Sequence, residues 1–260
     1  NEIVRRGITV GDKRSPRYFG GKFIVPYDKG GEGDSEGGWL PKYLLPTEYF
    51  IDWSESSVSA LRSDTIADIY KRQGKSVAIG KPHYNKTLAS ALRNQEFYFR
   101  RGITFSHTGM YSPSFRESGS ALFDMAGSTM FLEGSLQDEI LSSLNSRIWV
   151  SLFRNYVNAT VNTSEDPIKD VPLPLNIPEA ASVAVRSIVG KQARDRRYDY
   201  ASNEQLEIDR LVYAAYGLND GDIKEVENWY ARRYPKLAEA QRRNLAARLG
   251  RTEEQLLDRP

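Results

Sequence analysis

Residues 136–156 read LQDEILSSLNSRIWVSLFRNY, and this stretch constrains the fold strongly. Four apolar side chains recur at every fourth position, on one stripe of a helix that begins near Leu136; they are Ile140, Leu144, Ile148 and Leu152. A helix with one apolar stripe buries it against another layer of structure. We therefore expect a folded domain in which this helix flanks a sheet.

The residues before this helix favour β-structure. FYFRRGITFS, residues 97–106, is rich in aromatic and β-branched side chains and predicts a strand. ALFDMAGSTMFL, residues 121–132, predicts two shorter strands around Gly127. Strands and loops are also expected in the first 30 residues, followed by a flexible polar loop at 30–38, GGEGDSEGG.

Two short helices are expected between these strands. Residues 64–72 place Ile66, Ile69 and Tyr70 at helical spacing, with Asp64 as a candidate N-cap. Residues 84–92 could form the second helix.

The last third of the chain favours helices. Residues 167–178, PIKDVPLPLNIP, contain four prolines, which exclude a continuous helix or a central strand. Beyond them we expect helices at 204–216 with Gly217 as the stop, from Asn219 to Tyr234 with Pro235 as the stop, at 236–249, and after the capping-box pair Thr252 and Gln255.

The predicted fold class is α+β. A twisted, mostly antiparallel β-sheet with flanking helices would occupy residues 1–178. A helical tail at 179–260 would pack on this domain or on a partner.

Composition excludes several kinds of chemistry. The 260 residues include no cysteine and two histidines, so disulfides, thiolate metal sites and Cys nucleophiles are ruled out. No phosphate-binding loop, GxSxG or HExxH motif occurs, and the carboxylates show no metal-ligand spacing. We expect no metal site and no catalysis by this chain alone. No long apolar run or signal peptide is visible, which predicts no membrane contact and a cytoplasmic location.

The net charge of +2 conceals two basic stretches. Residues 1–29 hold seven basic and three acidic side chains, and residues 62–101 hold nine and three. Arginine can donate two parallel hydrogen bonds to guanine, and short hydroxyl side chains can donate to phosphate oxygens. The candidate DNA-binding residues are Lys13, Arg14, Arg17, Lys75, Lys81, Arg100, Arg101, Thr104, Ser106, His107, Tyr111 and Arg116. Protein-binding and sugar-binding modules use similar residues, so the residue types alone leave these alternatives open.

An internal similarity links two of these regions. RRGIT occurs at residues 5–9 and again at 100–104, and each copy is followed by Ser-Pro and an aromatic residue. Two copies are too few for a solenoid. They are either a duplicated strand–loop unit or a coincidence.

Several segments, in order, resemble the specificity region of one enzyme family. They are GITVGDKRSPRYF (7–19), IVPYDKGG (24–31), WLPKYLLPTEYFIDW (39–53), the long run from FYFRRGITFS to GSTMF (97–131), LSSLNSRIWVSLFRNYVNAT (141–160), DPIKDVPLP (166–174) and IDRLVYAAYGLNDGDIKEVENW (208–229). Together they resemble the target recognition domain of type IIG restriction–modification enzymes and of related adenine-specific DNA methyltransferases of BREX phage-defence systems. Where the family has Asn-Pro-Thr and Gly-Asp-Ile, this chain has Asn158-Ala159-Thr160 and Asp166-Pro167-Ile168.

The resemblance implies a module that reads double-stranded DNA for an adenine methyltransferase. In such enzymes a preceding domain binds S-adenosylmethionine and carries an Asn-Pro-Pro-Tyr motif for the flipped adenine, and neither feature occurs here. The implied partners are duplex DNA, the methyltransferase domain of the same full-length protein and subunits of a defence complex. A fused nuclease and the DNA sequence that is read stay open. The alternative is a protein-interaction module of a defence complex that does not read DNA.

Overall fold

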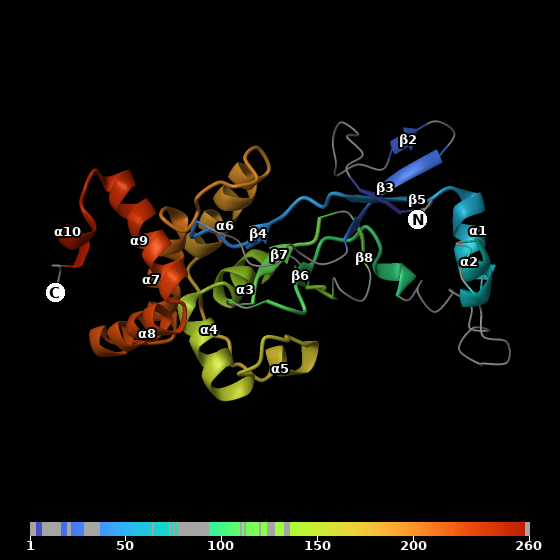
Figure 1. Ribbon diagram of the computed structural model, residues 1–260. Coiled ribbons are helices and arrows are strands. Elements are labelled where there is room, and N and C mark those ends of the chain that lie inside the picture. Colours follow the sequence, from blue (N-terminus) through green and yellow to red (C-terminus); the bar gives the residue numbers. More distant parts are fainter. Residues whose placement is uncertain are drawn as a thin grey trace. The chain divides into compact units, whose positions relative to one another are not determined.

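The chain folds into two compact units, as the computed structural model shows (Figure 1). The structure describes residues 4–6, 17–19, 22–28, 37–63, 65–72, 74, 76, 94–109, 111, 113–119, 121–123, 128–132 and 136–257. Unit 1 comprises residues 1–29, 47–100 and 119–124, and unit 2 comprises residues 30–46, 101–118 and 125–260. The boundary predicted after residue 178 therefore runs through unit 2.

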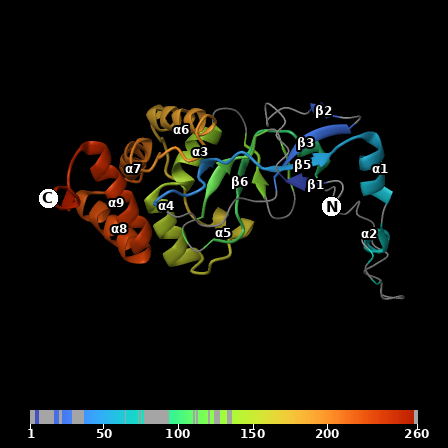
Figure 2. The same cartoon turned by 45° about the horizontal axis from the view of Figure 1, so that its top comes forward.

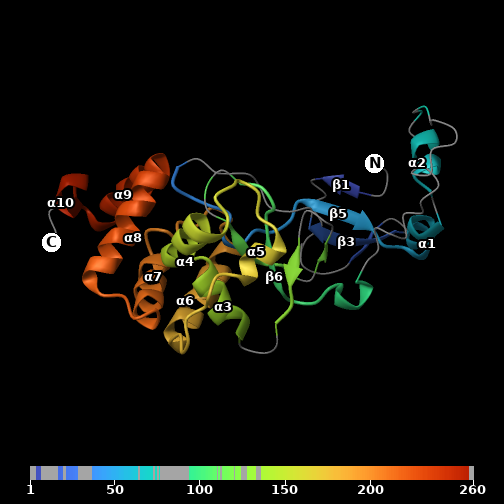
Figure 3. The same ribbon diagram turned by 90° about the horizontal axis from the view of Figure 1, so that it is seen from below.

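Unit 1 is built on a mixed sheet of short strands, which lie side by side in Figure 3. The order is β1 (Val4–Arg6), β5 (Tyr49–Asp52), β3 (Lys22–Asp28) and β2 (Arg17–Phe19), all antiparallel, and β8 (Leu122–Phe123) pairs with β3 in parallel. Helices α1 (Glu55–Ser63) and α2 (Ile66–Arg72) and the 3-10 turn η3 (Gln95–Phe97) follow in the same unit.

The described core of unit 1 is small. Val25, Ile51 and Leu122 are buried on three adjacent strands. Half-buried aromatic rings close over them, and the Trp53 ring meets the Tyr98 ring edge-on with 5.8 Å between centroids.

Unit 2 contains a second mixed sheet. Its order is β4 (Tyr43–Leu44), β7 (Phe115–Glu117), β6 (Ile103–Phe105) and β9 (Thr129–Met130), with β4 and β7 parallel and the other pairs antiparallel. The two strands expected around Gly127 are present as β8 and β9.

The helix expected from Leu136 is present but interrupted. It runs as α3 (Leu136–Leu144), breaks at Asn145 and Ser146, and resumes as α4 (Arg147–Leu152) and the π-helical turn η4 (Phe153–Val157). The break falls at Ser146, whose backbone is extended (ψ 154°) and whose Oγ caps α4 by accepting from the Trp149 amide (3.3 Å). Just before it, the Asn145 side chain reaches the sheet, where its Nδ2 donates to the Phe115 carbonyl (2.9 Å) and its Oδ1 accepts from the Phe115 amide (3.2 Å).

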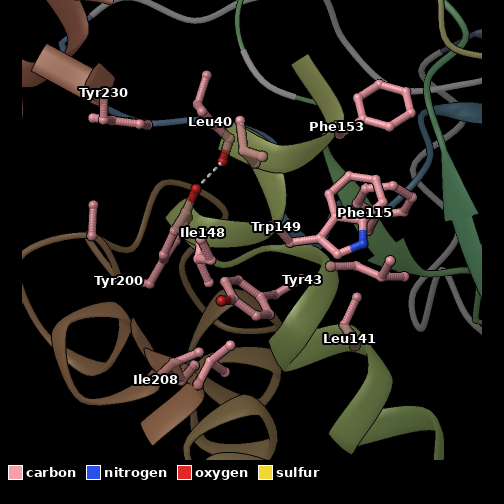
Figure 4. Close-up of a cluster of buried hydrophobic side chains, with 14 of the residues drawn as sticks. Leu40, Tyr43, Phe115, Leu141, Ile148, Trp149, Phe153, Tyr200, Ile208 and Tyr230 are labelled. Atoms are coloured by element: carbon pink, nitrogen blue, oxygen red, sulfur yellow. Dashed lines mark hydrogen bonds between the residues drawn. The ribbon is translucent and has the colours of Figure 1, made fainter. Parts of the chain in front are cut away.

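Helices surround the sheet of unit 2 and enclose one continuous core. Beyond α5 (Glu165–Lys169), α6 (Glu179–Gln192) packs beside α3, as Figure 2 shows, and also contacts α7 (Glu204–Ala215). The Trp149 ring is fully buried between Phe115 and Phe153, and the Tyr200 hydroxyl donates to the Leu40 carbonyl (Figure 4). This core joins residues from Trp39 to Leu237.

The C-terminal helices begin and end where local signals predict. Gly217 follows α7 at φ +74°, a conformation that favours glycine. Asn219 caps α8 (Asp220–Arg233) in a capping box with Asp222. Pro235 is the first residue of α9 (Pro235–Leu249), and Thr252 and Gln255 bond reciprocally at the start of α10 (Glu253–Leu257).

The strand predicted over 97–106 is wrong in its first half. Phe97 ends η3, and Phe99 takes a left-handed φ of +62°, so an extended strand forms only over Ile103–Phe105. The helix predicted at 84–92 and the cap at Asp64 lie outside the described residues. The mixture of helices and sheets is confirmed, and within the described residues no helix is both long and apolar enough to cross a membrane.

Candidate nucleic-acid interface

The second RRGIT copy leads into β6, and its glycine is required by close packing. A Cβ on Gly102 would lie 2.6 Å from the Met130 carbonyl oxygen and 2.7 Å from Thr129 Cγ2. Any side chain here would push β9 away from β6, so the glycine keeps these two strands in register.

Arg101, just before this glycine, is held in an ion-pair network. Its Nη2 lies 3.1 Å from Glu117 and 2.8 Å from Asp138, and Asp138 also accepts from Arg186 at 3.1 Å. The Arg101 side chain is 48% exposed. It would reach a phosphate only in exchange for one of these carboxylates.

Two of the predicted contact residues are buried in the sheet. Thr104 is 1% exposed and Arg116 is 2% exposed. Arg116 Nη1 donates to the Ser106 hydroxyl at 2.9 Å, so this arginine positions the residue that follows β6. Neither Thr104 nor Arg116 can meet DNA while β6 and β7 stay paired, and they support the site from within.

Two loops beyond β6 are joined into what we call the rim, residues 106–109 and 158–163. The Thr163 amide donates to the His107 carbonyl (2.6 Å), and the Gly109 amide donates to the Val161 carbonyl (3.1 Å). The isolated bridge between Thr108 and Asn162 completes this pairing.

A second buried arginine, Arg154, stabilises the rim through hydrogen bonds to its backbone. Arg154 is 5% exposed, and its guanidinium donates to the carbonyls of Asn158 (3.4 Å), Tyr111 (3.1 Å) and Thr160. The planar Arg154 guanidinium thus holds the loop after η4 and the loop after β6 together.

His107 forms a polar cluster at the edge of the rim. Its ring stacks on Phe105 with centroids 5.5 Å apart, and its Nε2 lies 2.8 Å from the Ser128 hydroxyl. Ser128 donates to Glu165, and this hydrogen bond lowers the pKa of the Glu165 carboxyl. In a serine hydrolase the carboxylate holds the histidine, and the histidine accepts from the serine. Here the serine lies between the other two, so the cluster is not a catalytic triad.

The rim and its neighbours present mainly uncharged groups to solvent. Thr108, Thr160 and Asn162 are exposed, and the Tyr156 side chain on η4 is 82% exposed. Glu165 adds a negative charge beside His107. Such groups can read base edges, but they attract phosphates weakly.

The remaining predicted residues lie elsewhere. Arg100 is exposed in unit 1, with its guanidinium 5.1 Å from the centre of the Phe97 ring. Arg17 lies in β2, and four more lie outside the described residues: Lys13, Arg14, Lys75 and Lys81. Of the predicted residues, the structure therefore gathers in unit 2 Arg101, Thr104, Ser106, His107, Tyr111 and Arg116.

Sequence reasoning missed a basic region that borders the rim. The Tyr111 ring meets the Tyr234 ring edge-on (6.0 Å between centroids), and the Arg233 guanidinium lies 5.5 Å from the same Tyr234 ring. The signal was present in the sequence, because residues 232–251 contain seven Lys and Arg and one acidic residue. Over residues 186–260 as a whole, 15 basic residues nearly balance 13 acidic ones, which conceals the excess at 232–251.

A buried polar network lies deeper in unit 2. The Lys42 ammonium donates to the Asn145 carbonyl (2.9 Å), and Asp209 Oδ1 accepts from the Arg147 amide (2.9 Å). Burial lowers the pKa of Lys42 to about 8 and raises the pKa of Asp209 to about 6. The pocket beside Lys42 has about 10 Å³ of free volume, room for roughly one water molecule, so this network supports the core.

The comparisons add no relative. No protein-family model and no curated protein matches the chain. Among the described residues, no group of three or more His, Asp or Glu side chains could hold a metal ion.

Proposed function

We propose that this chain is the recognition module of an adenine-specific DNA methyltransferase, of the restriction–modification or phage-defence kind, and that it reads double-stranded DNA. The observation that supports the proposal best is the rim. Two buried arginines fix it at the end of a sheet, because Arg116 holds the Ser106 hydroxyl and Arg154 holds the backbone of both loops. Fixed polar groups are what direct readout of base edges requires.

In this proposal the strands of both units belong to a recognition domain built on twisted, mostly antiparallel sheet. His107, Thr108 and Asn162 would read bases, and the exposed Tyr156 ring would pack against sugar or base. Arg100 would contact phosphate. The module would act in the cytoplasm beside a methyltransferase domain that binds S-adenosylmethionine. We assign S-adenosylmethionine no step in this chain.

The test measures sequence preference. The 260-residue chain is incubated with a pool of duplexes randomised in the centre, and the bound duplexes are sequenced. We expect a short motif to be enriched. His107→Ala and Asn162→Ala should flatten the preference at one or two positions, because a lost base contact costs about 1–3 kcal/mol. Asn228→Ala, an exposed asparagine on α8 outside the rim, is the matched control. Binding without any preference would exclude the recognition role.

One observation favours the alternative, a protein-interaction module of a phage-defence complex. The segment before α6 exposes Leu173 (40%) and Leu175 (81%), and α6 itself exposes Val183 (53%). Exposed apolar side chains close in sequence are typical of protein contacts. Binding of a purified defence-complex subunit that Leu175→Ser and Val183→Ser abolish, with no affinity for duplex DNA, would favour this function.

A further inference from the structure

The C-terminal helices concentrate positive charge on one stretch. The exposed side chains of Arg232, Arg233, Lys236 and Arg243, at the end of α8 and along α9, are here called the basic surface. Between residues 232 and 251 the sole acidic residue is Glu239. Residues 204–227, in contrast, contain seven acidic and two basic residues, so the charge reverses along the tail.

The helix dipole explains only part of this charge. Cations stabilise the C-terminal turn of a helix, which accounts for Arg232 and Arg233 on α8. Lys236, however, lies in the first turn of α9, where a positive charge is unfavourable and where no acidic residue compensates it. Arg243 lies in the middle of α9, where the dipole has little effect. The helix dipole therefore accounts for only two of the four cations.

Local ion pairs do not fully neutralise the charge of the basic surface either. Arg232 lies 3.0 Å from Glu225 and Arg243 lies 3.3 Å from Glu239, but all four side chains are more than half exposed. Such exposed pairs contribute about 0–1 kcal/mol, so a phosphate can replace the carboxylate at little cost. Arg233 and Lys236 have no carboxylate partner among the residues that the structure describes.

The spacing of these residues suits a nucleic-acid backbone. Lys236 and Arg243 are two turns apart on the same side of α9, which separates their Cα atoms by about 10 Å along the axis. Arg232 and Arg233 lie at the end of α8, just before the turn at Tyr234 and Pro235. Successive phosphates of one DNA strand rise by about 3.4 Å along the duplex axis, so Lys236 and Arg243 are separated by about three phosphate steps.

The basic surface also borders the rim through one ring. Arg233 lies over Tyr234, and Tyr234 contacts Tyr111 beside the loop after β6. The three arginines at the rim are not readily available, because Arg116 and Arg154 are buried and Arg101 is engaged by two carboxylates. A DNA duplex read by the rim needs its phosphates neutralised nearby, and the basic surface supplies that charge.

We infer that the basic surface of α8 and α9 binds the phosphate backbone of duplex DNA and provides most of the affinity that does not depend on sequence. The inference rests on the proposed function and adds a division of roles to it. The rim selects the sequence, and the C-terminal helices hold the duplex.

The test compares two variants with equal loss of charge. In the first, all four residues of the basic surface are changed: Arg232→Gln, Arg233→Gln, Lys236→Gln and Arg243→Gln. In the second, four exposed cations elsewhere in unit 2 are changed: Lys169→Gln, Arg194→Gln, Arg210→Gln and Lys224→Gln. Circular dichroism and thermal melting establish that both variants fold.

Affinity for a random-sequence duplex is measured by fluorescence anisotropy from about 50 to about 300 mM KCl. At the lowest salt we expect the first variant to bind at least about tenfold more weakly than wild type, and the second to stay within about threefold. The slope of log K against log salt should become shallower by about 3 for the first variant alone, because each phosphate contact contributes about 0.9. Equal behaviour of the two variants would overturn the inference.

The outcomes separate the inference from the proposed function. If the first variant binds weakly but enriches the wild-type motif, both stand. If wild type enriches a motif and the first variant keeps wild-type affinity, only the inference fails. If wild type binds random duplex through the basic surface but enriches no motif, only the recognition role fails. If wild type does not bind duplex DNA at all, or binds heparin and single-stranded RNA more tightly than duplex, the inference is wrong.

Discussion

Unit 1 and unit 2 differ in how they bury apolar surface. In unit 2 the described core is one cluster that includes Trp149. It joins a sheet to helices α3, α4, α6, α7, α8 and α9. In unit 1 the described core is three aliphatic side chains under half-buried aromatic rings. Because stability scales with the apolar area removed from water, the described core of unit 2 should contribute more of it than the described core of unit 1. The rim and the basic surface are both built on this well-packed unit.

The largest expected effect comes from the centre of the unit 2 core. Trp149→Ala removes a fully buried ring that contacts Phe115 (5.1 Å between centroids) and Phe153 (5.0 Å). The free energy of unfolding should fall by about 3–5 kcal/mol, measured by urea denaturation with circular dichroism. Tyr156→Ala, two turns further along and 82% exposed, should change it by less than about 0.5 kcal/mol. Similar losses in both variants would show that the core is not centred on Trp149.

The second effect depends on pH and on Asp209. Burial raises the pKa of this carboxyl from 3.8 to about 6, so between these values the folded chain keeps a proton that the unfolded chain releases. The contribution of Asp209 to stability is therefore lost as the pH rises from about 4 to about 6. Asp209→Asn keeps a neutral group at every pH. The free energy of unfolding of wild type relative to this variant should therefore fall over that range. Urea denaturation at both pH values measures the change. An increase in the relative stability of wild type would contradict a buried Asp209 carboxyl with a raised pKa.

The smallest effect is expected in unit 1. Leu122→Ala on β8 removes one of the three buried side chains and should cost about 2 kcal/mol, the lower end of the range for a buried leucine. Hydrogen exchange followed by mass spectrometry should show faster exchange in β3 and β5, with exchange in α3 unchanged. Equal acceleration in α3 would show that the two units unfold together, which would remove the contrast between them.

Local signals predicted the C-terminal helices correctly. The Asn219 capping box, the stop at Gly217 and the Thr252–Gln255 pair each act within four residues, so no distant contact was needed to recognise them. The strand at 97–106 failed for the opposite reason. Its aromatic residues favour a strand locally, but Tyr98 and Phe99 pack over the core of unit 1 while Ile103 begins the sheet of unit 2.

The candidate site shows the same limit. Arginine beside short hydroxyl residues singled out the loop after β6, where the His107 side chain is 37% exposed. Nothing in the sequence distinguishes Arg116, buried under Ser106, from Arg101 on the surface, since their burial depends on strand pairing. The excess of positive charge at the basic surface can be found from the sequence, because it needs only a count of charged residues within 20 positions.

The Asn145 side chain has a consequence for the length of α3. Its amide pairs with the amide and the carbonyl of Phe115, as a neighbouring peptide group would, beside the two-residue strand β4. One residue inserted into α3 would rotate Asn145 by about 100° about the helix axis and leave both backbone groups of Phe115 buried without a partner. Related chains should therefore tolerate substitutions on the outer side of α3 but almost no insertion or deletion within it.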